Sequence, residues 1–76
     1  MAIDPTITVA QAWADDRARL VALKTELETF SAAQAAEQEL YINDIAKVAA
    51  RNAYADTAMR IEQVDAAIAR LDELLA

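Results

Sequence analysis

No glycine occurs in this chain, and its single proline is Pro5. Tight turns between β-strands normally need glycine or asparagine at positive φ, so a chain of this kind has few means of joining strands into hairpins. Alanine, the best helix former, is the commonest residue, while the two strongest helix breakers are almost absent. The sequence therefore predicts an all-α protein.

The length of the chain, 76 residues, limits how stable its hydrophobic core can be. A domain of about this size buries only about 60% of its unfolded surface, and small domains usually gain stability from disulfides, metals or oligomerisation. This chain has neither cysteine nor histidine. Disulfides are therefore excluded, and oligomerisation or docking on a larger partner is the expected source of additional stability.

An apolar stripe predicts a first helix over about 9–29. Spacings of three, four and seven residues place its members on one side of a helix. These members are Val9, Trp13, Leu20, Leu23, Leu27 and Phe30. The stripe stops there, because residues 31–39 contain no apolar side chain larger than alanine. Ser31 and Gln34 fit a capping box, so a turn at about 29–31 is predicted, with one continuous helical rod as the alternative.

The most specific pattern in the chain is a repeat of seven residues in the last third of the sequence. One position of the repeat holds Tyr54, Ile61, Ile68 and Leu75, and a second position holds Thr57, Val64 and Leu71. Such a repeat is typical of a coiled-coil seam, which can join copies of a protein or pack two helices of one chain. Arg60 and Asp65 flank the repeat at positions that can pair between parallel copies, which favours self-association.

The apolar residues that precede this repeat are out of register with it. They are Leu40, Tyr41, Ile42, Ile45 and Val48. A break at 51–57 would give a bundle of three helices of nearly equal length, but no residue in that segment forces one, so a single second helix over about 32–75 is predicted. The predicted fold is a helical hairpin of residues 9–76 with a long, coiled-coil-like second helix.

Residues 1–8 have a different pattern and are predicted to form an N-terminal arm. Apolar residues alternate with polar ones in this segment, as in a strand. The alternating residues are Ile3, Pro5, Ile7 and Val9. A helix start is the competing interpretation, either with Asp4 as N-cap before Pro5 or with Thr8 as N-cap and Gln11 three residues later. An extended arm would have no strand of its own chain to pair with and would reach a neighbour.

The charge and composition of the chain argue against several classes of function. A net charge of −6 disfavours direct binding to nucleic acid, and no apolar run approaches the roughly 20 residues of a membrane span. Carboxylate metal sites in helical bundles normally also use histidine, which is absent here. We therefore expect no enzymatic activity, no cofactor or metal, and no small-molecule substrate.

The expected function is structural: an oligomerising or complex-docking helical module, such as a component of a phage particle or another large assembly. The alternative is a small acidic adaptor or inhibitor that binds a basic groove on a partner protein. Its expected location is the cytoplasm, or a virion or other assembly made there. The predicted interaction residues are Ile3, Ile7, Val9, Trp13, Tyr54, Ile61, Val64, Ile68, Leu71 and Leu75.

Overall fold

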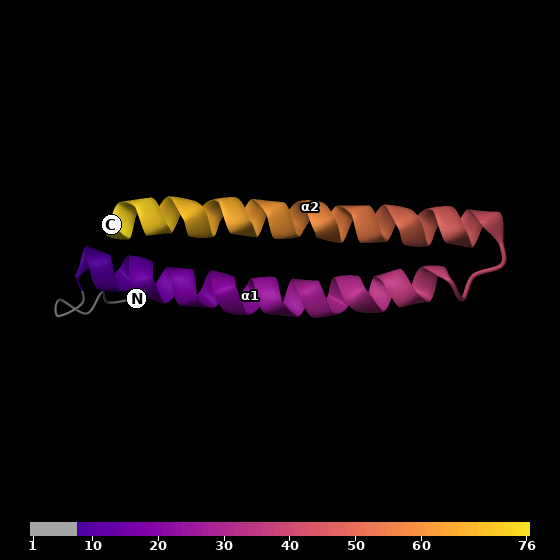
Figure 1. The fold of residues 1–76 in the computed structure, drawn as a ribbon, viewed down its shortest axis with the longest axis horizontal. Coiled ribbons are helices and arrows are strands. Elements are labelled where there is room, and N and C mark those ends of the chain that lie inside the picture. The colour runs from indigo at the N-terminus through magenta and orange to yellow at the C-terminus, as the bar shows by residue number, and fades with distance from the viewer. Residues whose placement is uncertain (1–7) are drawn as a thin grey trace, which may run out of the picture.

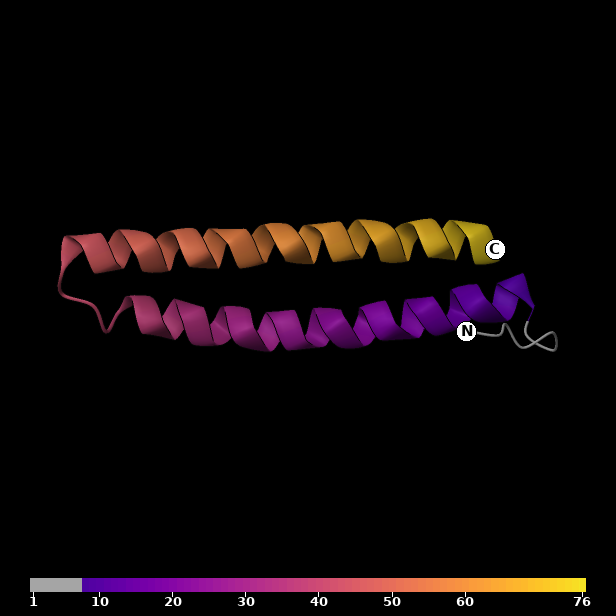
Figure 2. The same cartoon turned by 180° about the vertical axis from the view of Figure 1, so that it is seen from behind.

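The computed structural model describes residues 8–76, which form two α-helices packed side by side in opposite directions (Figure 1). Helix α1 spans Val9–Gln38, and helix α2 spans Asp44–Leu75. The C-terminus lies beside the start of α1, and the connection between the helices lies at the far end, as the reverse view also shows (Figure 2). The prediction of an all-α helical hairpin is confirmed.

Helix α1 begins with the capping box of Thr8 and Gln11, one of the two helix starts that the sequence left open. The backbone N–H of Gln11 donates to the Thr8 hydroxyl at 3.1 Å, and the N–H of Thr8 donates to the Gln11 side-chain oxygen at 2.9 Å. Two backbone donors of the helix start are thereby satisfied. The alternative start at Asp4, together with the rest of the predicted arm, lies outside the described residues.

The predicted turn at 29–31 is wrong, because α1 continues through this segment to Gln38. Half of residues 31–38 are alanine, so helix propensity carries α1 past the end of its apolar stripe, and Ser31 lies inside the helix rather than at a cap. The helix ends with tighter hydrogen bonds from the N–H of Glu39 to Ala36 O and from the N–H of Leu40 to Glu37 O. No residue between 8 and 76 has positive φ, so this helix end needs no glycine.

Helix α2 begins at Asp44 rather than near residue 32, and it has its own N-cap. The side-chain oxygen of Asn43 accepts hydrogen bonds from the N–H groups of Ile45 and Ala46 at 2.8 and 3.3 Å. Asp44 adds a negative charge to the first turn, where the helix dipole favours it. The helix then runs without interruption through 51–57, so the three-helix alternative is wrong, as is the continuous rod.

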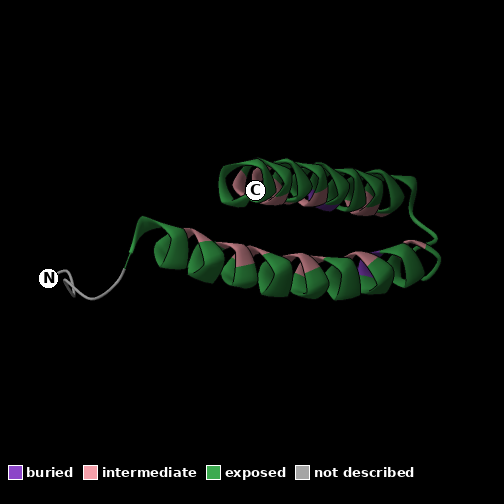
Figure 3. Ribbon diagram, turned by 60° about the vertical axis from the view of Figure 1, so that its left-hand side comes forward, coloured by how far each residue is buried: buried purple, intermediate pink, exposed green. Residues whose placement is uncertain are grey.

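The side chains between the two helices follow one stripe on each helix, with successive members mostly three or four residues apart. On α1 the shielded residues are Trp13, Arg17, Leu20, Lys24, Leu27, Ser31, Gln34 and Gln38. On α2 they are Ala46, Ala50, Thr57, Ile61, Val64, Ala67, Ile68 and Leu71. Figure 3 shows these stripes facing each other across the hairpin. The repeat predicted in the last third of the sequence therefore packs against α1 of the same chain.

The seam between the helices is incompletely covered. The molecule measures 56 × 27 × 15 Å, and its shortest dimension is close to the thickness of one helix with its side chains, about 10–12 Å. Among residues 8–76, the buried ones are Gln34, which is 8% exposed, and Thr57, which is 4% exposed; no apolar side chain is buried. A single layer of two helices therefore leaves every apolar side chain of the described chain partly in contact with solvent.

Candidate interaction surfaces

Two ion pairs connect α1 to α2 and define their relative register. Arg17 pairs with Asp72, and the Nζ of Lys24 lies 2.7 Å from an Asp65 carboxylate oxygen. The two basic residues are seven positions apart on α1, and the two acidic residues are seven positions apart on α2. Both ion pairs are therefore consistent with one antiparallel register of the two helices. Hydrogen bonding to Asp65, with a further contribution from its charge, raises the pKa of Lys24 above its ordinary value.

The half of the seam nearest the connection is polar. Its members from α1 are Ser31, Gln34 and Gln38, and the register places them beside the segment of α2 that contains Thr57. The Thr57 hydroxyl donates to the backbone oxygen of Ala53 at 3.1 Å. The buried side-chain oxygen of Gln34, in contrast, accepts no hydrogen bond from any residue between 8 and 76. The large apolar side chains of the seam therefore lie in the other half of the hairpin, where they are half-buried.

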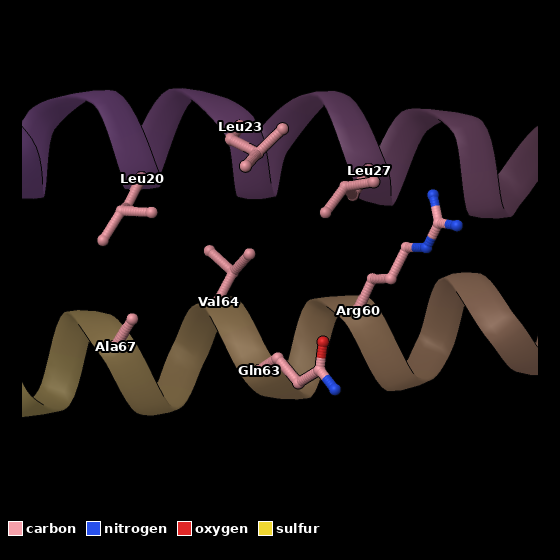
Figure 4. A pocket seen from close by; sticks show the side chains of 7 residues that line it. All are labelled: Leu20, Leu23, Leu27, Arg60, Gln63, Val64 and Ala67. Atoms are coloured by element: carbon pink, nitrogen blue, oxygen red, sulfur yellow. The ribbon is translucent and has the colours of Figure 1, made fainter.

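In that other half, an open groove of about 330 Å³ lies between the helices. Its lining residues are Leu20, Leu23, Leu27, Arg60, Gln63, Val64 and Ala67. Figure 4 shows Leu20 and Leu27 of α1 and Val64 of α2 directed into the space between the helices, with Leu23 lying along α1 between the two leucines. Arg60 extends toward α1 at one end, beside Leu27. We call this feature the groove.

The groove and the ion pairs lie on opposite sides of the seam. Arg60, Val64 and Ala67 are spaced by four and three residues and so share one stripe of α2. Asp65 and Asp72 lie on a different stripe of α2, on the other side of the seam. One side of the hairpin is therefore bridged by partly exposed ion pairs, whereas the other is open and apolar.

A second exposed apolar surface lies at the connection between the helices. It consists of Leu40, Tyr41, Ile42, Ile45 and Val48, and we call it the hairpin tip. Ile42 is 93% exposed and Ile45 is 81% exposed, which are the highest values among the large apolar residues of the described chain. Five large apolar side chains within nine residues of sequence are more than scattered surface hydrophobics, and clusters of this kind mark interaction sites.

Acidic residues accompany the hairpin tip. Glu37 and Glu39 precede it, and Asp44 lies within it. The Tyr41 hydroxyl donates a hydrogen bond to a Glu37 carboxylate oxygen at 2.7 Å. This bond, reinforced by the negative charge of Glu37, raises the pKa of Tyr41 above its ordinary value. The tip thus combines apolar side chains with three acidic residues and one basic residue, Lys47.

The structure separates the predicted interaction residues into three groups. Trp13, Ile61, Val64, Ile68 and Leu71 are half-buried in the seam between α1 and α2, where they contribute to the fold of the single chain. Val9, Tyr54 and Leu75 are exposed at the ends or edges of the stripes. Ile3 and Ile7 lie outside the described residues.

Sequence reasoning missed the hairpin tip as a surface. The sequence predicts that the residues from Leu40 to Val48 belong to a long second helix, out of register with the repeat that follows them. The adjacent pair Asn43 and Asp44 carried the missing signal, because asparagine is a preferred N-cap and an acidic residue favours the first helical turn. A helix start at this pair exposes the apolar residues around it.

Within residues 8–76, neither helix has a stretch that is long and apolar enough to cross a membrane. The same part of the chain contains no cluster of three or more acidic, histidine or cysteine residues arranged to hold a metal ion. Comparisons of the chain with protein-family models, with curated proteins and with solved structures found no match.

Proposed function

We propose that this protein is a non-enzymatic assembly module, a helical hairpin that associates with copies of itself to cover its exposed apolar surface. The observation that carries the proposal is the absence of any buried apolar side chain between residues 8 and 76, in a chain of which 57% is hydrophobic. Full burial of one Leu, Ile or Val contributes about 1.5–3 kcal/mol, and a single layer of two helices realises only part of this. Association with another copy would bury more of these side chains and add the part of this free energy that the single hairpin lacks.

The shape of the hairpin supports the same proposal. Both broad faces of a molecule only 15 Å thick are accessible, and the groove and the hairpin tip provide two separate apolar surfaces on it. A module with two such surfaces can associate through one and attach to a larger structure, such as a phage particle, through the other. Hairpins that pair into bundles are a common solution to the marginal core of a short chain.

The mass and the thermal stability of the protein in solution test this proposal. Light scattering should give a mass that is a multiple of 8.3 kDa, and the midpoint of thermal unfolding, followed by circular dichroism, should rise with protein concentration. A mass of one chain, with a midpoint that stays constant across the same concentrations, would overturn self-assembly.

The alternative function, a small acidic adaptor, is favoured by one specific observation. The hairpin tip is the most exposed apolar surface of the described chain, and Glu37, Glu39 and Asp44 border it. An apolar cleft with a basic rim on a partner protein would complement both properties. Such a complex should weaken steeply as salt rises, because the charges at its border are screened, whereas apolar self-association should not.

A further inference from the structure

We infer that a second copy of this chain occupies the groove, so that two hairpins form a four-helix bundle in which each α2 packs on α1 of the other copy. This inference rests on the proposed self-assembly and adds the surface, the orientation and the charge pairs that define it. The first argument is the asymmetry of the hairpin: the ion pairs of Lys24 and Arg17 bridge one side of the seam, while the groove leaves the other side open.

The open side is apolar over more than the groove itself. Leu23 lines the groove and is 41% exposed, and Phe30, about two turns further along α1, is also exposed on the same stripe. On α2 the corresponding stripe continues from Ala67 to the exposed Leu74. On each helix this apolar stretch covers about eleven residues, or roughly 16 Å. Helices α1 and α2 of a second copy, of 30 and 32 residues, are long enough to cover it.

The charges at the border of the groove are self-complementary. Arg60 lies at one end of the groove, and among residues 8–76 it forms no ion pair. Glu26 lies three positions after Leu23 and four before Phe30, on the border of the same surface, and within the described chain it is likewise outside every ion pair. In a two-fold interface, each residue of such an oppositely charged couple can meet its complement on the other copy.

The register of the hairpin determines the orientation of the two copies. The pair of Lys24 with Asp65 places Arg60 level with residue 29 of α1, which is within one turn of Glu26. If the two-fold axis runs parallel to the helices, α2 of one copy lies over α1 of the other at the same level. Arg60 of each copy then comes within reach of Glu26 of the second copy, and every helix has antiparallel neighbours. Both hairpin tips lie at the same end of this bundle.

Substitutions in the groove test the surface. Leu23→Asp should reduce the mass measured by light scattering to that of one chain, because it places a charge in the proposed interface. Met59→Asp is the matched control: Met59 is 52% exposed, lies outside the groove, and its replacement should leave the mass unchanged. If Leu23→Asp stays associated while Ile42→Asp in the tip becomes monomeric, self-assembly stands and the groove inference fails. If the unmodified protein is monomeric, both fail.

Charge reversal tests the contact without adding a charge to the apolar surface. Arg60→Glu and Glu26→Arg should each weaken association by about five-fold or more, because each change creates two repulsive pairs per dimer. The double variant should restore association to within about two-fold of the unmodified protein. Circular dichroism at high concentration verifies that each variant remains helical. Single variants that associate normally, or a double variant as weak as the singles, would overturn the charge pair.

The orientation has its own measurement. The chain has no cysteine, so Glu39→Cys allows one spin label per copy beside the tip. Two tips at the same end of a four-helix bundle place the labels within about two helix diameters, roughly 20–25 Å. Tips at opposite ends would separate them by about the 45 Å length of α1 and would contradict the proposed orientation. 

Discussion

Gln34 is the one buried amide side chain of the described residues, and its oxygen accepts no hydrogen bond there. A buried polar atom without a partner costs about 1–3 kcal/mol, whereas a leucine at the same position would add apolar contact. We expect Gln34→Leu to raise the free energy of unfolding in urea by about 1 kcal/mol. Gln38→Leu, at a half-buried position one turn later, should change it less. A less stable Gln34→Leu variant would show that the amide makes a bond that the hairpin needs.

Tyr41 offers a direct spectroscopic measure of the structure at the hairpin tip. Its hydroxyl donates to Glu37, which favours the protonated phenol and raises the pKa of Tyr41. In a Tyr54→Phe background, Tyr41 is the only tyrosine, so absorbance of the phenolate reports its titration alone. Glu37→Gln should shift that titration to lower pH, because it removes the negative charge. An unchanged titration would mean that the bond does not persist in solution.

At the scale of the helices, the position of the connection can be tested with one insertion made at two places. Two glycines inserted after Phe30 fall inside α1, where each costs roughly 1 kcal/mol relative to alanine, and they rotate residues 31–38 away from the seam. The same insertion between Tyr41 and Ile42 lengthens the connection and should cost little. Circular dichroism and thermal unfolding should therefore show a clear loss for the first variant and near-normal values for the second. The reverse result would indicate that the chain turns near residue 30 and not at residues 39–43.

At the scale of the whole molecule, the half-buried apolar residues of α2 hold the hairpin closed. Ile61→Asp or Ile68→Asp places a charge between the helices and should reduce the free energy of unfolding by roughly 2 kcal/mol or more. Helix content should fall with it, since long helices of this kind depend on packing for their stability. Met59→Asp, on the exposed surface of α2, should have little effect. Unchanged stability in both isoleucine variants would show that these residues do not stabilise the hairpin.

The pair of Lys24 and Asp65 joins the two helices and makes stability depend on alkaline pH. Because folding raises the pKa of Lys24 above 10.5, its stabilising contribution is complete below pH 10.5 and is lost as pH rises through the folded pKa. The thermal midpoint of Lys24→Met should therefore fall less than that of the unmodified protein between about pH 9 and about pH 11.5. Equal declines would show that the pair does not persist in solution.

Local features of the sequence determined the helical class, the start of α1 and the residues of the seam. The lack of glycine and proline leaves helix as the favoured backbone state at almost every position, and the capping box of Thr8 and Gln11 operates through bonds within four residues. The repeat identified most of the stripe of α2 that faces α1, although it left open whether the partner helix belongs to the same chain. None of these features requires knowledge of distant contacts.

The place of the turn was decided by the tertiary structure. Helix propensity is nearly uniform across the alanine-rich segment 31–38, so it cannot select an end point there. A turn at 29–31 would leave helices of very unequal length, with much of the second one unpartnered. The turn at residues 39–43 gives helices of 30 and 32 residues, so their stripes face each other and both interhelical ion pairs form. The same turn leaves the large apolar residues from Leu40 to Val48 exposed at the tip. The N-cap at Asn43 is a local signal for the start of α2, but the pairing of two whole helices is a property of the folded chain, and it sets where α1 ends.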